Sequence, residues 1–234
     1  MALACSSTNL QAQTVHGQPD IWLFWHNNYK FAEKWSVQTE VHMRFDDYFR
    51  YKEQFLFRPS ITFQPAKQVS YSLGYTYIHT FPYGQYPLAT DRPEHNIWEQ
   101  VQFKQKIKKV SLTHRLRLEQ RFQSSFDSEQ NKFDFAEVQY GNRFRYRISI
   151  KVPITDKLSF HAFDELWIRS TNKIKDISFD RNWFYAGLGY QFTPAVGLQL
   201  GYLHQYIKNN ATLFEQHHTM QLTLKTVIGK PKTT

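Results

Sequence analysis

Residues 110–122 read VSLTHRLRLEQRF, and this stretch decides the fold class. Its even positions carry the apolar side chains Val110, Leu112, Leu116, Leu118 and Phe122, and its odd positions carry Ser111, Thr113, Arg115, Arg117, Glu119 and Arg121. A period of two over this length predicts a β-strand with one apolar face and one polar face.

The same alternation returns in residues 135–154, where arginines again interleave with aromatic and branched side chains. A soluble β-sandwich would place its polar face in bulk water. Here the polar face is nearly all arginine and glutamate, while the apolar face is long and rich in aromatic residues. This combination is typical of an outer-membrane β-barrel, in which the apolar face meets lipid and the charged face lines the interior.

The composition agrees with this interpretation. No run of 18 apolar residues occurs in the sequence, which excludes a transmembrane helix. The aromatic content of 17% suits the aromatic girdles that a barrel carries at both membrane interfaces. The net charge of +9 would fit nucleic-acid binding, but the charges alternate within strands instead of forming a basic run. We therefore expect membrane lipid as a partner and no nucleic acid.

Eleven alternating segments follow one another, joined in turn by tight turns and by longer connections: residues 20–31, 36–45, 52–64, 69–79, 96–107, 110–122, 135–154, 158–168, 183–192, 196–206 and 217–227. This wiring predicts an all-β protein, a single antiparallel, up-and-down transmembrane barrel over residues 14–234. Because bacterial single-chain barrels have an even number of strands, we expect 10 or 12 strands. Ten would follow if residues 20–31 formed a plug or a partial strand, and would place both chain ends at the short-turn side. Twelve would follow if the N-terminal tail or residues 135–154 supplied another strand.

Two local features carry further expectations. Residues 1–13 read MALACSSTNLQAQ and resemble the end of a secretory signal peptide, cleaved after Ala12 or Gln13. The single cysteine, Cys5, excludes an internal disulfide framework, and Ala4-Cys5 can alternatively be interpreted as a lipoprotein site. Glu99 falls on the apolar face of its segment, which a β-bulge or an interface position would explain.

The inward face collects most of the charge. We predict a lumen charge network made of Glu40, Arg44, Arg58, Arg115, Arg117, Glu119, Arg121, Glu137, Arg143, Arg145, Arg147, Glu165 and Arg181. Unpaired charge in a confined lumen is costly, so arginines should pair with glutamates and fill the barrel. Glu119 should lie near an arginine of a neighbouring strand, while Leu116, Leu118, Phe144 and Tyr146 should point outward.

Three functions fit this pattern. The first is a largely occluded, basic lumen in a structural or partner-binding barrel that is not an enzyme. The second is a narrow anion-selective pore for small solutes, because arginines outnumber carboxylates in the network. The third, a lipid-modifying enzyme, needs serine and histidine on the lipid face. That face offers only His114, His204, His218 and Asp164, with no serine clearly beside them.

We expect no cofactor and no metal. His217 and His218 are adjacent, and adjacent residues of a regular strand face opposite sides, so this pair cannot chelate one ion. Gly187 and Gly189 alternate on an inner face, which predicts close packing at a bend of the barrel instead of a phosphate loop. The sequence leaves the oligomeric state open.

Five segments, HRLRLEQRF, NRFRYRISI, FDELW, FDRNWFYAGLGYQF and LGYLHQY, resemble the uncharacterised "domain of unknown function 2490" family of Gram-negative, often Bacteroidota, proteins. The resemblance runs from about Ile21 to Leu224. It implies a predicted outer-membrane β-barrel and brings no established activity or catalytic residue. One departure from many outer-membrane barrels is the C-terminus, which continues as GKPKTT instead of ending on an aromatic strand residue.

Overall fold

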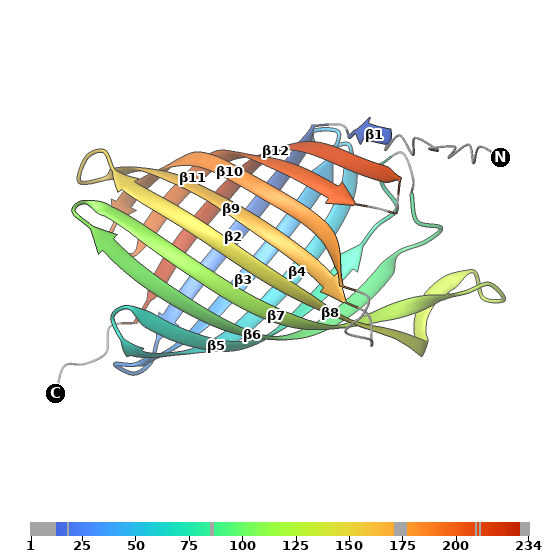
Figure 1. Cartoon of the computed structure of the whole chain (residues 1–234), viewed down its shortest axis with the longest axis horizontal. Helices are drawn as coiled ribbons and strands as arrows, with labels where there is room; N and C mark the ends of the chain where they lie inside the picture. The colour runs from blue at the N-terminus through green and yellow to red at the C-terminus, as the bar shows by residue number, and fades with distance from the viewer. Residues whose placement is uncertain are drawn as a thin grey trace, which may run out of the picture.

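In the computed structural model the chain forms one closed β-barrel (Figure 1). The structure describes residues 13–17, 19–84, 87–170, 177–208, 210 and 212–229, so the signal-peptide and Cys5 expectations lie almost wholly outside it. The strands are β1 (Gln13–His16), β2 (Asp20–Lys30), β3 (Trp35–Asp46), β4 (Tyr51–Ala66), β5 (Val69–Thr80), β6 (Arg92–Ile107), β7 (Val110–Asp127), β8 (Lys132–Pro153), β9 (Leu158–Ser170), β10 (Ser178–Thr193), β11 (Val196–Lys208) and β12 (Leu213–Ile228). Within these described ranges, no helix is long and apolar enough to cross a membrane.

Strands β2 to β12 form the wall, and β12 closes it by pairing with β2. We call the β2–β12 pairing the seam. The short β1 pairs with residues 213–216 of β12, next to the residues 219–228 that pair with β2, and so extends the seam. The described wall therefore has 11 strands, and the expectation of 10 or 12 was wrong. Residues 20–31 are not a partial strand, because β2 pairs with β12 from Asp20 to Tyr29.

The closing pair is parallel, which corrects the expectation of a purely antiparallel barrel. In an up-and-down barrel with an odd number of strands, the first and last strands run in the same direction, so they can only meet in parallel. For the same reason β2 begins at one end of the barrel and β12 finishes at the other. The two ends of the wall do not both lie at the short-turn side.

The two ends of the barrel differ in their connections. At the end that we call the short-turn end, neighbouring strands are joined by residues 31–34, 67–68, 108–109, 154–157 and 194–195. The opposite, long-loop end carries the connection 81–91 and the extended β7–β8 hairpin, which projects beyond the rim (Figure 1). Short turns at one end and longer connections at the other are how outer-membrane barrels are built.

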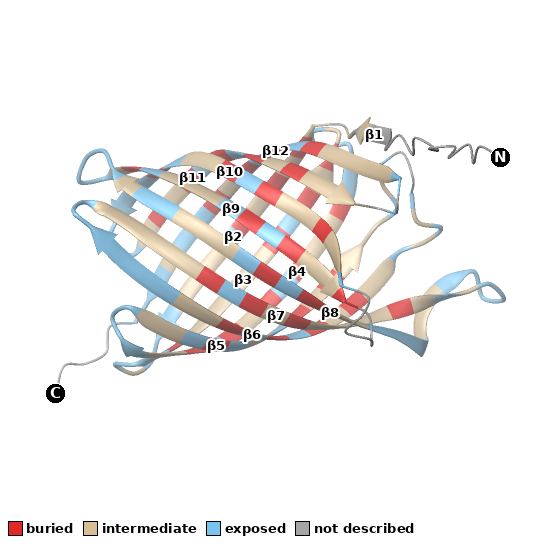
Figure 2. Cartoon of the chain, viewed as in Figure 1, coloured by how far each residue is buried: buried red, intermediate tan, exposed pale blue. Residues whose placement is uncertain are grey.

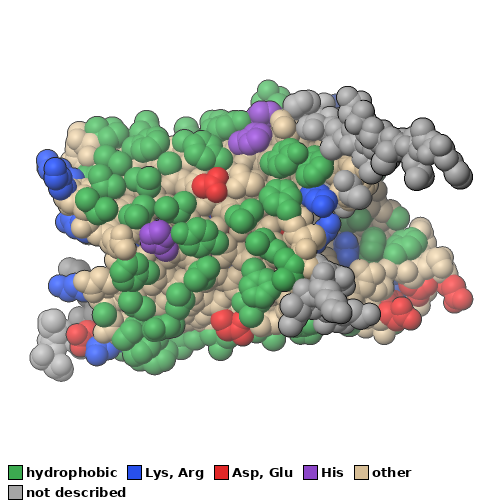
Figure 3. All heavy atoms as spheres, in the orientation of Figure 1, with side chains coloured by type: hydrophobic (Ala, Val, Ile, Leu, Met, Phe, Trp, Pro, Cys, Tyr) green, Lys and Arg blue, Asp and Glu red, His purple; other side chains and the backbone are tan. Residues whose placement is uncertain are grey.

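The burial pattern is the inverse of that in a soluble protein. Among the described residues, 30 polar or charged side chains are buried, against nine hydrophobic ones. Buried and exposed positions alternate along each strand (Figure 2). Large apolar side chains cover the outer wall (Figure 3), including Leu116 at 56% and Phe144 at 47% exposure. Only an apolar surrounding makes this arrangement favourable, because exposed apolar surface in water is destabilising.

The apolar part of the interior is an aromatic cluster on β2 and β9–β11, formed by Trp22, Phe24, Trp167, Trp183, Tyr185 and Leu203. Glycines make room for it. A Cβ at Gly187 or Gly201 would collide with the Tyr185 phenol, and a Cβ at Gly74 would collide with the Trp98 indole. The close packing expected at Gly187 is therefore present, with Tyr185 as the packed side chain.

The parallel seam predicts a specific cross-link. In a chain with Cys5→Ser, the pair Ile21→Cys and Met220→Cys should form a disulfide, because these residues are direct partners across β2 and β12. Adjacent strands bring Cα atoms to within disulfide range. The product should migrate faster on a denaturing gel until it is reduced.

The matched control pairs Ile21→Cys with Leu224→Cys, whose partner is Trp25. The two cysteines would lie about 13 Å apart along the strand direction, beyond disulfide range. Equal cross-linking of both pairs, or of neither, would contradict the parallel seam.

Candidate functional site

The middle of the lumen is filled by a charged group of side chains from β7, β8 and β9. We call it the central cluster, and it consists of Arg115, Arg117, Glu119, Arg143, Arg145, Arg147 and Glu165. Glu119 and Glu165 are 1% and 0% exposed. A carboxylate this deeply buried is tolerated only when it is paired and hydrogen-bonded.

Glu119 is surrounded by arginines. One of its oxygens accepts from Arg143 Nε at 2.8 Å and lies 2.6 Å from Arg143 Nη2. The other accepts from Arg145 Nη1 at 2.6 Å and lies 3.7 Å from Arg117 Nη1. The sequence-based expectation that Glu119 approaches an arginine of a neighbouring strand is met by Arg143, its direct partner on β8.

Glu165 holds the other side of the cluster. It accepts from Arg145 Nε at 2.8 Å, from Arg147 Nη2 at 2.5 Å and from Arg115 Nη2. Arg145 therefore bridges both glutamates with one guanidinium. The planar, five-donor geometry of arginine suits this role, which lysine could not fill.

The two glutamates are needed because the arginines face one another. Arg115 lies directly opposite Arg147, and Arg117 directly opposite Arg145, on neighbouring strands. Like charges in direct cross-strand pairs are destabilising. Glu119 and Glu165 sit beside these pairs and neutralise part of their charge.

Aromatic rings stabilise the remaining positive charge. The Arg145 guanidinium lies 3.5 Å from the Trp167 ring centroid, and Arg117 lies 3.9 Å from Trp98. Arg147 stacks on Phe163 at 3.9 Å. Cation–π contacts of this kind strengthen when water is excluded. The central cluster thus has an arginine–glutamate layer packed against an aromatic layer inside the barrel.

The other predicted network residues fall into three places. Arg58 pairs with Glu40 at 2.8 Å, and Arg44 donates to Gln54 at 2.6 Å while stacking on Trp22. Towards the long-loop end, Arg121 donates two hydrogen bonds to Glu94, at 2.8 and 2.7 Å. Arg181 lies 3.3 Å from its neighbour Asp180.

Glu137 is the one predicted member that lies outside the network. The register of β7 and β8 shifts between Ser124 and Ser125, which leaves residues 135–137 without partners on β7. Glu137 is exposed on this bulge of the projecting hairpin. The apolar alternation changes phase at the same place, from the odd positions Phe133 and Phe135 to the even positions Val138 and Tyr140.

Sequence reasoning also missed five buried carboxylates, namely Asp20, Asp46, Glu53, Glu94 and Asp180. Glu53 accepts from Trp22 Nε1 at 2.7 Å because a register shift opposite Arg44 turns it inward. Asp180 likewise sits at a register shift in β10. Glu94 lies outside the expected segment 96–107, whereas β6 already begins at Arg92. Two of these had a usable cue in the alternation: Glu94 keeps an even spacing from Asn96 and Trp98, and Asp46 keeps it from Arg44.

Each end of the lumen opens into a hollow. The long-loop mouth has a volume of about 1030 Å³ and mixes both signs of charge, with Asp46, Asp47, Glu94 and Glu215 beside Arg50, Arg92, Arg121 and His217. Tyr83, from the connection 81–91, also lines this mouth, and burial raises the pKa of its phenol. The short-turn mouth, about 440 Å³, has a basic lining.

On the outer wall, the polar side chains form separate local pairs. His114 bonds the Tyr146 hydroxyl at 2.8 Å, and His218 bonds Tyr202 at 2.6 Å. Asp164 accepts from the Asn182 amide at 3.1 Å. Among the described residues, no serine hydroxyl bonds to any of these groups.

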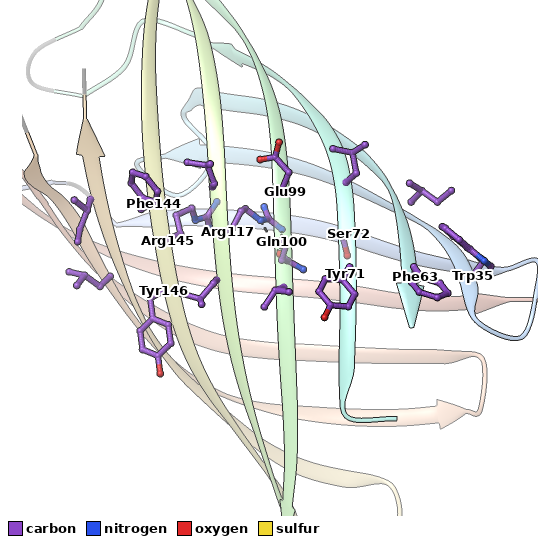
Figure 4. Close-up of a pocket in the computed structure, with 17 residues that line it drawn as sticks. Trp35, Phe63, Tyr71, Ser72, Glu99, Gln100, Arg117, Phe144, Arg145 and Tyr146 are labelled. Carbon is purple, nitrogen blue, oxygen red and sulfur yellow. Dashed lines mark hydrogen bonds between the residues drawn. The ribbon is translucent and has the colours of Figure 1, made fainter. Parts of the chain in front are cut away.

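A hollow of about 850 Å³ indents the outer wall between β3 and β9 (Figure 4). Its lining is almost wholly apolar and includes Phe63, Leu116 and Phe144. Glu99 also lines it, faces outward in an unbroken register, and accepts from the Gln120 amide at 3.1 Å. Of the two explanations for Glu99, the β-bulge is therefore wrong, and the interface position stays a prediction.

One group of residues has metal-ligand chemistry. The ligand atoms of His26, Glu40 and His42 lie within 4.8 Å of one another inside the lumen. However, Arg58 already donates to Glu40 at 2.8 Å, and Arg147 and Lys225 line the same hollow as His26. These positive charges oppose a cation, which favours the expectation of no metal.

The central cluster predicts a large effect from one neutralisation. Glu119→Gln leaves Arg143 and Arg145 without a buried counter-charge, and should lower the free energy of unfolding by about 3–5 kcal/mol. The matched control is Glu137→Gln, an exposed position that should change it by less than about 0.5 kcal/mol. Urea unfolding from lipid vesicles measures both. Equal stability of the two variants would mean that the cluster is solvated and the lumen open.

The chain is similar to outer-membrane proteins. Over 121 residues it is 31% identical to Outer membrane protein P1 from the Rd strain of Haemophilus influenzae, and the same holds for a second P1 sequence from that species. The alignment covers 49% of this chain but only 26% of either relative. The chain therefore spans about a quarter of the length of the curated relatives it matches.

Two solved structures are similar at lower levels. A NanC porin aligns with a TM-score of 0.48 and 10% identity, over 83% of this chain and 90% of the porin. LpxR from Salmonella typhimurium aligns with a TM-score of 0.46 and 8% identity, over 81% of this chain and 83% of LpxR. Likenesses this distant carry no activity over to the chain.

The match to a protein family covers most of the barrel. Residues 20–217 match the family described as "Protein of unknown function (DUF2490)". This range includes the central cluster and all strands from β2 to β11. The chain is an outer-membrane β-barrel protein, and it belongs to the DUF2490 family.

Proposed function

We propose that this protein is a barrel closed at mid-height, which serves the outer membrane as a structural or partner-binding element and not as an enzyme. The observation that carries the proposal is the central cluster. Arg117, Glu119 and Arg145 are at most 4% exposed, although they line what would otherwise be a channel. Side chains this buried leave no path for solute beside them.

The size of the barrel supports closure. Barrels of about eight strands have an interior that side chains just fill, whereas wide aqueous channels appear at about 16 to 18 strands. With 11 strands, the interior is only moderately larger than the filled case. Seven long charged side chains, with Trp98 and Trp167 stacked on them, occupy that extra space.

A narrow anion-selective pore is the second candidate, and one observation favours it. Five arginines surround only two glutamates in the central cluster, so the constriction keeps an excess of positive charge. Basic linings favour anions over cations. This function would require the arginine side chains to move apart transiently.

A lipid-modifying enzyme is supported least. Acyl transfer by a serine needs a base in contact with it and a third group that orients the base. On the outer wall, His114 and His218 are bonded to tyrosines, and the His204 ring lies against His218. The Ser159 hydroxyl lies 2.9 Å from His161 Nε2, but this pair lies in the short-turn mouth, and no described carboxylate bonds to His161.

Planar-bilayer conductance tests closure. The wild-type barrel should give no steady current, because the central cluster blocks the lumen. Arg117→Ala should open a gap beside Trp98 and produce measurable steps. Leu116→Ala, the adjacent residue on the lipid-facing side of β7, is the matched control and should stay silent.

The outcomes separate the candidates. Large, steady and weakly selective wild-type currents would refute closure. Small wild-type steps whose reversal potential follows the chloride gradient would favour the narrow anion pore.

A further inference from the structure

The short-turn mouth has a lining that, apart from Arg147, takes no part in the proposed closure. Its hollow of about 440 Å³ is bordered by four cationic side chains, Lys104, Arg147, Lys151 and Lys225, and by no carboxylate. These residues come from β6, β8 and β12, so the positive charge surrounds the hollow instead of lying along one strand. We call this hollow the basic vestibule.

The lysines of the basic vestibule are not neutralised. Among the described residues, Lys104, Lys151 and Lys225 form no ion pair, although the central cluster a few residues deeper is densely paired. Lys225 Nζ instead donates to the neutral Gln199 side chain at 2.5 Å. Arg147 does pair with Glu165, but it shares that carboxylate with Arg115 and Arg145. Positive charge therefore remains in excess here.

Neutral hydrogen-bond donors surround these charges. The hydroxyls of Ser111, Thr113 and Ser149 line the same hollow, with the amide of Gln221. His26 also borders it, and its buried Nε2 has no hydrogen-bond partner. Several donors converging from different strands around lysines match the needs of an anion with several oxygens.

Lys151 and Lys225 are the central pair. Both line the basic vestibule and also the adjoining hollow of about 180 Å³ beside the 154–157 turn, so they face a common space. Two ammonium groups that share a space repel each other, and an anion between them would remove that repulsion. An anion with two or more charges would gain most.

The other end of the lumen lacks this property. Four carboxylates line the long-loop mouth beside its basic residues. Of the two mouths, only the short-turn mouth therefore has a lining with cationic side chains and no carboxylate. In outer-membrane barrels the short turns face the periplasm.

We propose that the basic vestibule is a binding site for a soluble, multiply charged oxyanion of the phosphate class. Binding needs no passage through the central cluster, so the site does not depend on whether the lumen conducts. In this site the phosphate oxygens would pair with Lys151 and Lys225. The hydroxyl and amide groups that line the hollow would donate the other hydrogen bonds to the anion.

Calorimetric titration of the detergent-folded full chain with pyrophosphate tests the proposal. Wild type should bind, and added salt should weaken binding because the site is open to solvent. The double variant Lys151→Gln and Lys225→Gln should bind at least about tenfold more weakly, because two unit charges close to the anion are lost. Heat-modifiable migration on a gel checks that each variant is folded. If the double variant fails this check, the two single variants replace it, and each should bind pyrophosphate several-fold more weakly than wild type.

The matched control is Lys34→Gln with Lys109→Gln. These lysines lie in turns at the same end of the barrel but do not line the basic vestibule, so the control removes the same net charge. It should bind like wild type. No binding by wild type at millimolar pyrophosphate, or equal loss in control and double variant, would overturn the proposal.

A second arm identifies the source of the phosphate group. In nanodiscs of phosphatidylcholine alone, and of phosphatidylcholine with phosphatidylglycerol, a soluble ligand should bind with the same affinity. If pyrophosphate bound more weakly only in the nanodiscs that contain phosphatidylglycerol, and excess pyrophosphate overcame this competition, the same site would be supported. Its natural ligand would then be a lipid headgroup.

Discussion

The structure depends on two buried carboxylates that hold five arginines together. Without Glu119 and Glu165, the direct cross-strand pairs of arginines on β7 and β8 would repel each other in a space that water cannot screen. With them, Arg145 can bridge both glutamates and still stack on Trp167. A barrel needs its interior filled as well as its wall closed. Here the interior is filled by ionic and aromatic contacts, because the apolar residues are needed on the outside.

Much of this organisation could be predicted from the sequence, because the period of two survives in nearly every strand. It correctly assigned the inward direction of Glu119 and the outward direction of Phe144. It failed where a strand gains residues. Glu137 leaves the network at one register shift, and Glu53 and Asp180 enter the lumen at two others. At the first of these shifts the sequence does carry a cue, because the apolar positions change parity from Phe133 and Phe135 to Val138 and Tyr140. Around Glu53 the neighbouring residues show no comparable change of phase.

The number of strands was predicted wrongly for a different reason. Eleven alternating segments were visible in the sequence, and the structure pairs eleven strands into the wall. The expectation of an even number came from a rule about other barrels and overrode that direct count. The consequence of an odd number is one parallel pair, and β2 meets it with ten consecutive pairings to β12, from Asp20 to Tyr29. The backbone N–H and C=O groups therefore find hydrogen-bond partners at the seam as they do between the other strands. This pairing is what the membrane interior requires of a spanning strand.

The net charge of +9 is distributed unevenly along the barrel axis. The central cluster uses most of its charge in internal pairing, and the long-loop mouth balances Arg121 with Glu94. At the short-turn end, Lys151 and Lys225 line a hollow whose lining contains no carboxylate. Unneutralised lysines in a concave space give a stronger local potential than the same charges on a convex surface, because the low-dielectric wall focuses the field. The two proposals fit together on this basis: the central cluster closes the lumen at mid-height, and the short-turn mouth binds an anion without passing it through the barrel.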